Sequence, residues 1–301
     1  MSKFPTMKPL DLKDRAIFDR YFKLSKTGLS ACSFINIFIW KDFFDFCWEV
    51  IDGNLCIFAE DKIGCFLYLP PLGGKVFSSA VKKSFEIMDF KNLNGNISRI
   101  ENIEDKDKKA YPKVGLKTLV KSEDYLYLRV DLAGLKGNKY KSKRAAVNYF
   151  QKNYQFEYLP FRKSDAPECL RLYKNWQGQR EKQYSDRIYI QMLKDNFKAQ
   201  KTAMGHLKEL GLMGRVIKIK NKIKAYTLGF KLNKDTFCIL FEVADLKIKG
   251  IANFLFRKFC EELKGFTYIN CMDDSGLENL KKVKLSFRPC KIIPAYIATR
   301  N

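Results

Sequence analysis

Two carboxylates follow an uninterrupted apolar run in the second half of the chain. The run Phe237–Phe241 has the sequence FCILF; Glu242 follows it at once and Asp245 three residues later. An apolar run of this length predicts a strand that is buried on both faces. A carboxylate at the end of such a strand can orient or deprotonate an amine nucleophile, so Glu242 and Asp245 are candidate catalytic residues. A structural ion pair with a nearby lysine is the alternative role for Glu242.

A short loop leads from this strand into a predicted helix. The loop ends with Lys249 and Gly250, and the apolar stripe of the helix begins at Ile251. The first turn of a helix leaves backbone N–H groups without partners, so such a junction can bind a phosphate. Lys249, Gly250 and Ile251 are therefore candidate cofactor-binding residues.

Two further acidic residues precede the next predicted helix, which runs from about Gly276 to Leu285. Asp273 and Asp274 are placed to cap that helix through its free N–H groups. Recognition of a cationic aminoacyl group by Asp273 is the alternative. Metal, disulfide and thiol chemistry are not expected, because the nine cysteines form no Cys-x-x-Cys pair and the chain has one histidine.

The charge is strongly positive and unevenly distributed. The net charge is +23, and residues 141–301 hold 33 Lys and Arg against 15 Asp and Glu, a balance of +18. An excess of this size implies a polyanionic partner, namely tRNA, a nucleotide cofactor or an anionic membrane surface. General solubility of a lysine-rich protein is the alternative.

Several stretches of the last third resemble one known family. They match the C-terminal catalytic region of bacterial phosphatidylglycerol lysyltransferases, and match still better the uncharacterised soluble proteins that carry this region alone. The stretches are Phe241–Asp245, Lys249–Ala252, Tyr268–Asn270, Gly276–Leu277 and Lys281–Pro289. The resemblance implies two tandem acyltransferase domains of the GNAT superfamily, in which the strand-to-helix junction holds the donor.

The resemblance also implies residues that bind substrate, through the phosphates of a tRNA acceptor end or of a lipid head group. Lys139, Lys143 and Arg144 belong to a stretch similar to the family signature Lys-Tyr-x-x-Lys-Arg, and Trp176 and Arg180 to a Trp-x-x-x-Arg pattern. The remaining positions are Asn270, Asp273, Lys282 and Arg288. Helix capping, packing and ordinary surface charge are the structural alternatives.

Two departures from coenzyme A-dependent enzymes bear on the donor. The loop keeps one glycine, Gly250, where those enzymes have more, and no tyrosine lies between Gly276 and Leu285 to serve as a general acid. The resemblance therefore implies an aminoacyl-tRNA donor rather than acyl-CoA. The alternatives are a coenzyme A-dependent N-acyltransferase of a small amine and a non-catalytic tandem protein that only binds polyanions.

The wider pattern predicts an α+β protein with two GNAT-like domains, residues 1–137 and 138–301, each a mostly antiparallel sheet flanked by helices. Both halves show a strand meander followed by a helix, and the glycine-containing segment 134–138 is the expected linker. The apolar run Phe34–Trp40 is too short to span a bilayer, and residues 1–5 lack the apolar core of a signal peptide. We expect a cytoplasmic protein, with peripheral attachment to the membrane as the alternative, and leave its oligomeric state open.

Overall fold

The computed structural model describes residues 7–25, 27–73 and 77–300. By contacts the chain forms two compact units. The first consists of residues 1–124 together with 293–301, and the second of residues 125–292. The expected domains 1–137 and 138–301 stay a prediction, because compactness alone does not define a domain that folds by itself.

The first unit is built on a mostly antiparallel sheet in the order β1-β2-β3-β4-β5-β12. Only β4 and β5 pair in parallel, through Leu67 and Ile100. The strands are β1 (Lys8–Pro9), β2 (Asp45–Ile51), β3 (Asn54–Glu60), β4 (Cys65–Leu67), β5 (Arg99–Glu104) and β12 (Lys291–Thr299).

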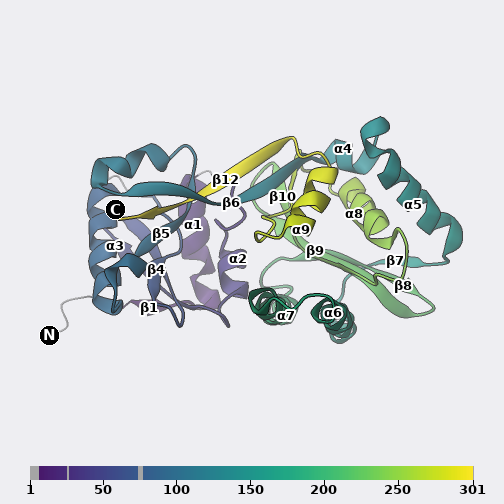
Figure 1. Ribbon diagram of the computed structural model, residues 1–301, viewed down its shortest axis with the longest axis horizontal. Helices are drawn as coiled ribbons and strands as arrows, with labels where there is room; N and C mark the ends of the chain where they lie inside the picture. The colour runs from purple at the N-terminus through teal and green to yellow at the C-terminus, as the bar shows by residue number, and fades with distance from the viewer. Residues whose placement is uncertain (1–6, 26, 74–76, 301) are drawn as a thin grey trace. The chain divides into compact units, whose positions relative to one another are not determined.

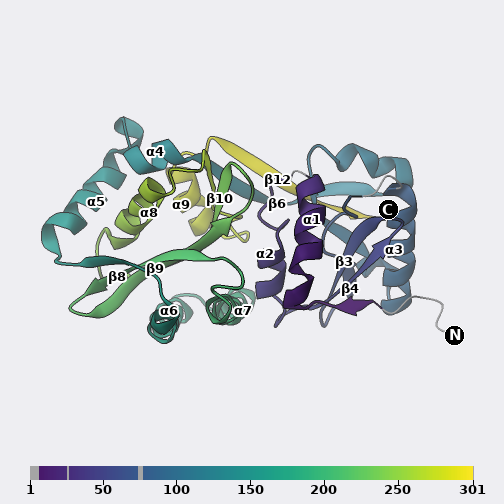
Figure 2. The ribbon, with the colours of Figure 1, turned by 180° about the vertical axis from the view of Figure 1, so that it is seen from behind.

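Helices cover the two faces of this sheet. Helix α3 (Phe77–Lys91) packs on β3 and β4, where the Ser84 hydroxyl lies 3.6 Å from the Cys56 sulfur. Helices α1 (Arg15–Ser25) and α2 (Phe34–Ile39) lie on the other face (Figure 2). There Phe18 of α1 packs edge-on against Trp48 of β2 and against Phe34 of α2. These aromatic contacts form the core between α1, α2 and the sheet.

The second unit repeats this plan in the order β6-β11-β10-β9-β8-β7. Only β10 and β11 pair in parallel. The strands are β6 (Lys117–Leu128), β7 (Glu157–Pro160), β8 (Met213–Ile219), β9 (Lys222–Lys231), β10 (Thr236–Ala244) and β11 (Tyr268–Asn270).

Two helical layers enclose this sheet (Figure 1). Helix α8 packs with α4 and α5 on one face, and α6 packs with α7, β9 and β10 on the other. The helices are α4 (Arg129–Gly134), α5 (Lys141–Asn153), α6 (Ala166–Glu181), α7 (Arg187–Gly205), α8 (Ile251–Glu262) and α9 (Glu278–Ser286). Single 3-10 turns occur at Leu12–Asp14, Gly95–Ile97, Lys108–Ala110, Pro112–Val114, Asn138–Tyr140 and Lys163–Asp165.

Both units therefore follow one plan, in which an antiparallel meander leads to a helix, a parallel strand and a final antiparallel strand. The expected α+β class is confirmed, and the elements from residue 225 onward follow in the order β-β-α-β-α-β. The composition of residues 125–132 predicts one strand over the whole stretch, and this prediction is wrong: β6 ends at Leu128 and Arg129–Gly134 is helical. Strand β11 begins at Tyr268, so the pairing of β6 ends one step further on, where the Arg129 N–H donates to the Thr267 carbonyl at 2.9 Å. Helix α4 then packs on α8.

Candidate functional site

Glu242 lies where two parallel strands of the second unit separate. Strand β10 pairs with β11 only through Thr236–Cys238 and then continues to Ala244 without that partner. A register irregularity between Ile239 and Phe241 shifts the alternation of side chains just before Glu242. Ala244, which is on the same face as Glu242, packs with residues of α8, so the carboxylate is on the α8 side of the sheet.

Glu242 is exposed on the strand, and the protein around it still desolvates its carboxylate. Every other residue of β10 is buried, whereas Glu242 is exposed. No hydrogen bond or ion pair to its side chain occurs among the described residues, so the structural ion pair considered for it is not formed. Desolvation by the surrounding protein raises the pKa of Glu242 to about 8. A carboxylate of this pKa is able to accept a proton near neutral pH.

Asp245 is held by its neighbours. Its Oδ2 accepts from the Lys224 Nζ at 2.9 Å, and its Oδ1 from the Lys247 N–H at 3.1 Å. Burial by itself would raise the pKa of Asp245, but these hydrogen bonds and the lysine charges outweigh it and keep the pKa below its ordinary value. The lysine partner that was considered for Glu242 thus belongs to Asp245. A catalytic role for Asp245 stays a prediction.

The strand-to-helix junction is closely packed against α5. Gly250 has φ +86°, and a Cβ there would lie 2.1 Å from the Ala146 carbonyl oxygen. The space that this glycine leaves on its Cβ side is therefore filled by α5. The Lys249 Nζ lies 4.7 Å from the Tyr149 ring centre, and Ile251 is buried as the first residue of α8.

Free backbone donors nevertheless remain in the first turn of α8. Within the described chain, the N–H groups of Ala252 and Asn253 have no acceptor, and Gly250 provides no side-chain cap. The junction keeps the general property of a helix start without the glycine-rich approach of coenzyme A enzymes. Cofactor binding by Lys249, Gly250 and Ile251 stays a prediction.

The loop after β11 is fixed by its own side chains. Asn270 is fully buried, and its Oδ1 accepts from the Met272 N–H at 2.7 Å. Asp273 accepts from the Ser275 N–H at 3.0 Å, and Asp274 from the Gly276 N–H at 2.9 Å. The expectation that Asp273 and Asp274 cap the following helix was wrong. That helix begins at Glu278, two residues later than expected, with Leu277 at its N-cap, so the two carboxylates hold the preceding turn instead.

Lys284, a basic residue of a stretch expected to hold phosphates, anchors the same loop instead. The Lys284 Nζ donates to the carbonyl groups of Met272 at 3.1 Å, of Asp273 at 2.6 Å, and of Cys271. These three acceptors lie eleven or more positions earlier in the chain, and no spacing rule links them to Lys284. It stands within the family-like stretch Lys281–Pro289, and that was the one available signal.

Two of the basic stretches meet in the second unit. The Lys143 Nζ lies 4.0 Å from the ring centre of Phe287, and the Tyr140 hydroxyl donates to the Phe287 carbonyl at 3.1 Å. Burial lowers the pKa of Lys143. Arg288 is exposed next to this contact and has φ +57°. Stretches that lie more than 130 residues apart thus form one basic surface around Phe287.

The remaining candidates of these stretches have local partners. Arg144 donates to the carbonyl groups of Leu135 and Gly137, so its guanidinium fastens the end of α4. Lys139 pairs with Asp131 at 3.5 Å. Lys282 lies 3.8 Å from Glu278 in a highly exposed pair along α9. Substrate binding by these three residues stays a prediction.

Trp176 and Arg180 share one face of α6, as their spacing predicts. The Arg180 Cζ lies 5.4 Å from the Trp176 ring centre. The guanidinium therefore lies over the indole ring, and substrate binding by the pair stays a prediction. A separate groove of about 430 Å³ lies between α5, β7 and α8. None of the candidate residues lines it.

Comparison with known proteins identifies the family. The family described as "Phosphatidylglycerol lysyltransferase, C-terminal" matches residues 22–299. The chain belongs to this family. No curated protein matches it. Among solved structures, a conserved protein of unknown function from Bacteroides thetaiotaomicron VPI-5482 is similar, with a TM-score of 0.87 and 26% identity over 99% of this chain and 100% of that chain.

Solved structures with lower identity, from this phosphatidylglycerol lysyltransferase C-terminal family and from related folds, share the fold of this chain. L-PGS from Bacillus licheniformis has a TM-score of 0.67 and 18% identity over 99% of this chain and 94% of that chain. A tandem GNAT protein from the clavulanic acid biosynthesis pathway has a TM-score of 0.53 and 10% identity over 98% of both chains. The expected tandem GNAT-like fold is confirmed, and family and fold together point to a GNAT-like acyltransferase.

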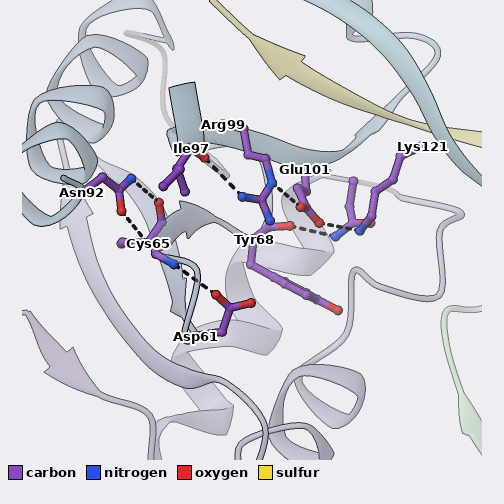
Figure 3. Close-up of polar contacts among 10 residues, drawn as sticks. Asp61, Cys65, Tyr68, Asn92, Ile97, Arg99, Glu101 and Lys121 are labelled. Carbon is purple, nitrogen blue, oxygen red and sulfur yellow. Dashed lines mark hydrogen bonds and ion pairs between the residues drawn. The ribbon is translucent and has the colours of Figure 1, made fainter. Parts of the chain in front are cut away.

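The first unit of this family member closes the place that corresponds to the site. There β4 and β5 correspond to β10 and β11, but the Asn102 Nδ2 donates to the Tyr68 carbonyl at 2.8 Å and bridges the two strands. Lys121 bonds both Asn102 and Glu101. Glu101 in turn accepts from Arg99 at 2.6 Å, so Lys121, Glu101 and Arg99 form one line of contacts (Figure 3). Side chains thus bridge β4 and β5 in the first unit, whereas β10 continues past its pairing with β11 to Glu242 in the second.

In residues 7–25, 27–73 and 77–300, no helix is long and apolar enough to cross a membrane. No group of three or more metal-binding side chains gathers in the same part of the chain.

Proposed function

We propose that this chain transfers an aminoacyl group from tRNA to an amine or hydroxyl acceptor, with Glu242 as the general base. The observation that carries the proposal is Glu242 itself, an exposed carboxylate without a partner on the separated part of β10. Its pKa of about 8 suits proton transfer at neutral pH. Family membership and the tandem GNAT-like fold support acyl transfer as the reaction class.

The transfer needs no covalent intermediate on the protein. The nitrogen or oxygen of the acceptor attacks the ester carbonyl of the donor, and Glu242 accepts the proton that this atom loses. The ester bond to the terminal ribose of the tRNA then breaks, and the ribose oxygen leaves as a hydroxyl with the proton that Glu242 gives back. Binding both substrates in one orientation supplies much of the rate, because it makes the reaction effectively unimolecular.

The charge of the second unit supports a polyanionic donor. Lys143 and Arg288 meet at Phe287 and have no carboxylate partner among the described residues. Coenzyme A is the less suitable donor, because α5 fills the space beside Gly250. Lysine-rich surfaces contact phosphates without reading bases, so we expect donor binding to be salt-dependent and insensitive to tRNA sequence.

Single-turnover transfer from radiolabelled aminoacyl-tRNA to a panel of amine and hydroxyl acceptors tests the proposal, with acyl-CoA as the competing donor. We expect Glu242→Gln to slow transfer at least about 100-fold while tRNA binding is retained. We expect Lys143→Gln with Arg288→Gln to weaken tRNA binding and to flatten its dependence on log salt by about one to two.

Three outcomes would contradict the proposal. Transfer from acyl-CoA alone would show that the donor is not aminoacyl-tRNA. Unchanged transfer by Glu242→Gln would show that Glu242 is not the general base. Absence of tRNA binding at low salt would leave the basic surface as ordinary solvated charge.

A further inference from the structure

The groove of about 430 Å³ between α5, β7 and α8 lies wholly within the second unit. Ligand sites in proteins are commonly hollows of this size. Its apolar lining consists of Val147 from α5, Phe254 from α8, Phe156, and Tyr158 from β7. Val147 and Phe254 are buried, whereas Phe156 and Tyr158 are half-buried. The groove therefore leaves aromatic surface open to a ligand.

The aromatic rings of this lining hold one another in place. The Phe156 ring centre lies 4.8 Å from that of Phe254 and 4.8 Å from that of Phe150. The Tyr158 ring meets Phe254 edge-on at 6.3 Å. Because these contacts already fix the rings, a ligand that lies on them costs little side-chain entropy. An apolar group placed there also removes apolar surface from water, so the rings suit the apolar body of a ligand.

One face of α8 adds charge to the groove. Arg257, Lys258 and Glu261 follow Phe254 by three, four and seven positions, which is the spacing of a single helix face. Glu261 accepts from the Lys258 Nζ at 3.0 Å and lies 3.2 Å from the Arg257 Nε. Two cations therefore share one carboxylate, and the charged lining has a positive balance of one.

The Arg257 guanidinium has donors that a ligand can reach. Its Nε donates to the Ala133 carbonyl at 3.0 Å, whereas its Nη groups form no hydrogen bond with any residue that the structure describes and are not enclosed by protein. The Arg257 side chain is 29% exposed and the Lys258 side chain 44%. On the α5 wall, the exposed amide of Gln151 likewise has no hydrogen-bond partner in the described part of the chain.

We propose that this groove binds a small molecule that joins an apolar ring to a single carboxylate. The ring lies on Phe156, Phe254 and Tyr158. The carboxylate accepts hydrogen bonds from Arg257 and Lys258, and its one negative charge balances the lining. A dianionic phosphate ester would bring uncompensated charge next to apolar rings, and an amine would be repelled. The site is separate from the transfer reaction, because no residue proposed for that reaction lines it.

Titration with hydrocinnamate, a phenyl ring joined to a carboxylate by a short methylene chain, tests the site by calorimetry and proton NMR. We expect it to bind at least about fivefold more tightly than hydrocinnamyl alcohol, which lacks the charge-assisted hydrogen bonds. The amine and the phosphate ester of the same skeleton should also bind more weakly than the carboxylate. Nuclear Overhauser contacts between the phenyl protons and the Val147 methyl groups should place the ligand in the groove.

Charge changes in the lining test the role of the carboxylate. Lys258→Gln should weaken hydrocinnamate binding about three- to fivefold, as expected for an exposed ion pair. Glu261→Gln should strengthen binding, because both cations lose the acceptor that they share. Lys152→Gln is the matched control, since Lys152 is exposed on α5 outside the groove and its loss changes the net charge equally. This variant should bind as the wild type does.

Gln151→Trp keeps the test independent of folding defects. Because Gln151 is exposed, the variant should melt near the wild-type temperature, while its indole ring fills the groove and abolishes binding of hydrocinnamate and of the alcohol alike. Four results would overturn the site: no binding by the wild type, equal binding of carboxylate and alcohol, equal weakening by Lys258→Gln and Lys152→Gln, or undiminished binding by Gln151→Trp. Each of them would leave the proposed transfer by Glu242 untouched.

Discussion

Glu242 carries opposite consequences for catalysis and for stability. Its pKa of about 8 lies well above the ordinary value of 4.5. Between these two pH values the folded protein holds a proton that the unfolded chain has lost. Stability therefore falls as the pH rises from about 4.5 to about 8, while the fraction of the carboxylate that can act as a base rises. The residue thus becomes useful under the conditions in which it is least favourable to the fold.

Glu242→Gln separates these two effects. We expect it to melt at the wild-type temperature near pH 4.5, where both side chains are neutral, and at a higher temperature than the wild type above pH 8. Wild-type transfer should increase with pH through about 8, and the variant should lose that dependence. Melting curves and single-turnover rates over pH 4.5 to 9 provide the measurement.

The control for this series is Glu278→Gln. Glu278 is exposed on α9 and makes one loose contact with Lys282. An alkaline gain in stability in this variant as large as that in Glu242→Gln would mean that the effect comes from removing any negative charge.

At the residue scale the sequence located some side chains and not their partners. The position of Glu242 follows from the end of an apolar run, which is a local pattern. The partner of Asp245 does not, because Lys224 lies on the neighbouring strand, 21 positions earlier. The hydrogen bonds from Lys284 to the Met272 and Asp273 carbonyl groups depend on the fold of the whole loop, so residue spacing does not predict them.

At the scale of the elements, α5 packs directly against the start of α8 at Gly250. A side chain there would need both a left-handed backbone and the space of the Ala146 carbonyl. Glycine is required for two separate reasons, and only the second involves another helix.

Gly250→Ala should therefore cost about 3 kcal/mol or more of unfolding free energy, since overpacking adds to backbone strain. Gly115→Ala is the matched control: Gly115 has φ +78° and nothing within 4 Å of an added Cβ. We expect it to cost about 1 kcal/mol, from the backbone alone. Denaturant unfolding of both variants measures the difference, and equal losses would show that α5 yields to the added methyl group.

The elements themselves were mostly predictable, because apolar periodicity and turn residues are local signals. The turn at Asn233–Asp235 is one example: the Asn233 Oδ1 accepts from two following N–H groups, as its residue type predicts. The boundary at Leu128 was missed, because Tyr125–Leu132 keeps the composition of a strand on both sides of the point where β6 becomes α4. Tertiary contacts decide such a boundary, and propensity does not.

In the whole molecule, each unit completes its sheet with a strand from a distant part of the chain. Strand β12 pairs with β5 through Ala295–Glu104 and Tyr296–Ile103, and residues 125–128 of β6 lie in the second unit. Sequence reasoning placed the C-terminal residues with the second domain, because nothing in their composition indicates which sheet they join.

Removal of residues 293–301 should therefore damage the first unit rather than the second. Strand β5 would lose its partner and become a bare edge. We expect its amide protons to exchange at least about tenfold faster, equivalent to about 1.4 kcal/mol, while those of β9 and β10 stay protected. Hydrogen exchange resolved by residue makes the comparison.

Tyr296→Phe provides the control, because it keeps the strand and removes only the hydroxyl that bonds Asp105 and Lys108. Exchange in β5 should stay near the wild-type rate. Faster exchange in β9 and β10 of the truncated chain would contradict the separation into two units.

The late arrival of β12 also matters while the protein is being made. The Tyr296 hydroxyl bonds Asp105, which lies 191 positions earlier. At about 5 to 20 residues per second, the ribosome exposes β5 for roughly 10 to 40 seconds before the strand that covers it exists. During that time the growing first unit has an open sheet edge that invites pairing with other chains. The nascent chain is thus most vulnerable to aggregation before its synthesis ends, and its yield should depend on chaperones and on the speed of translation.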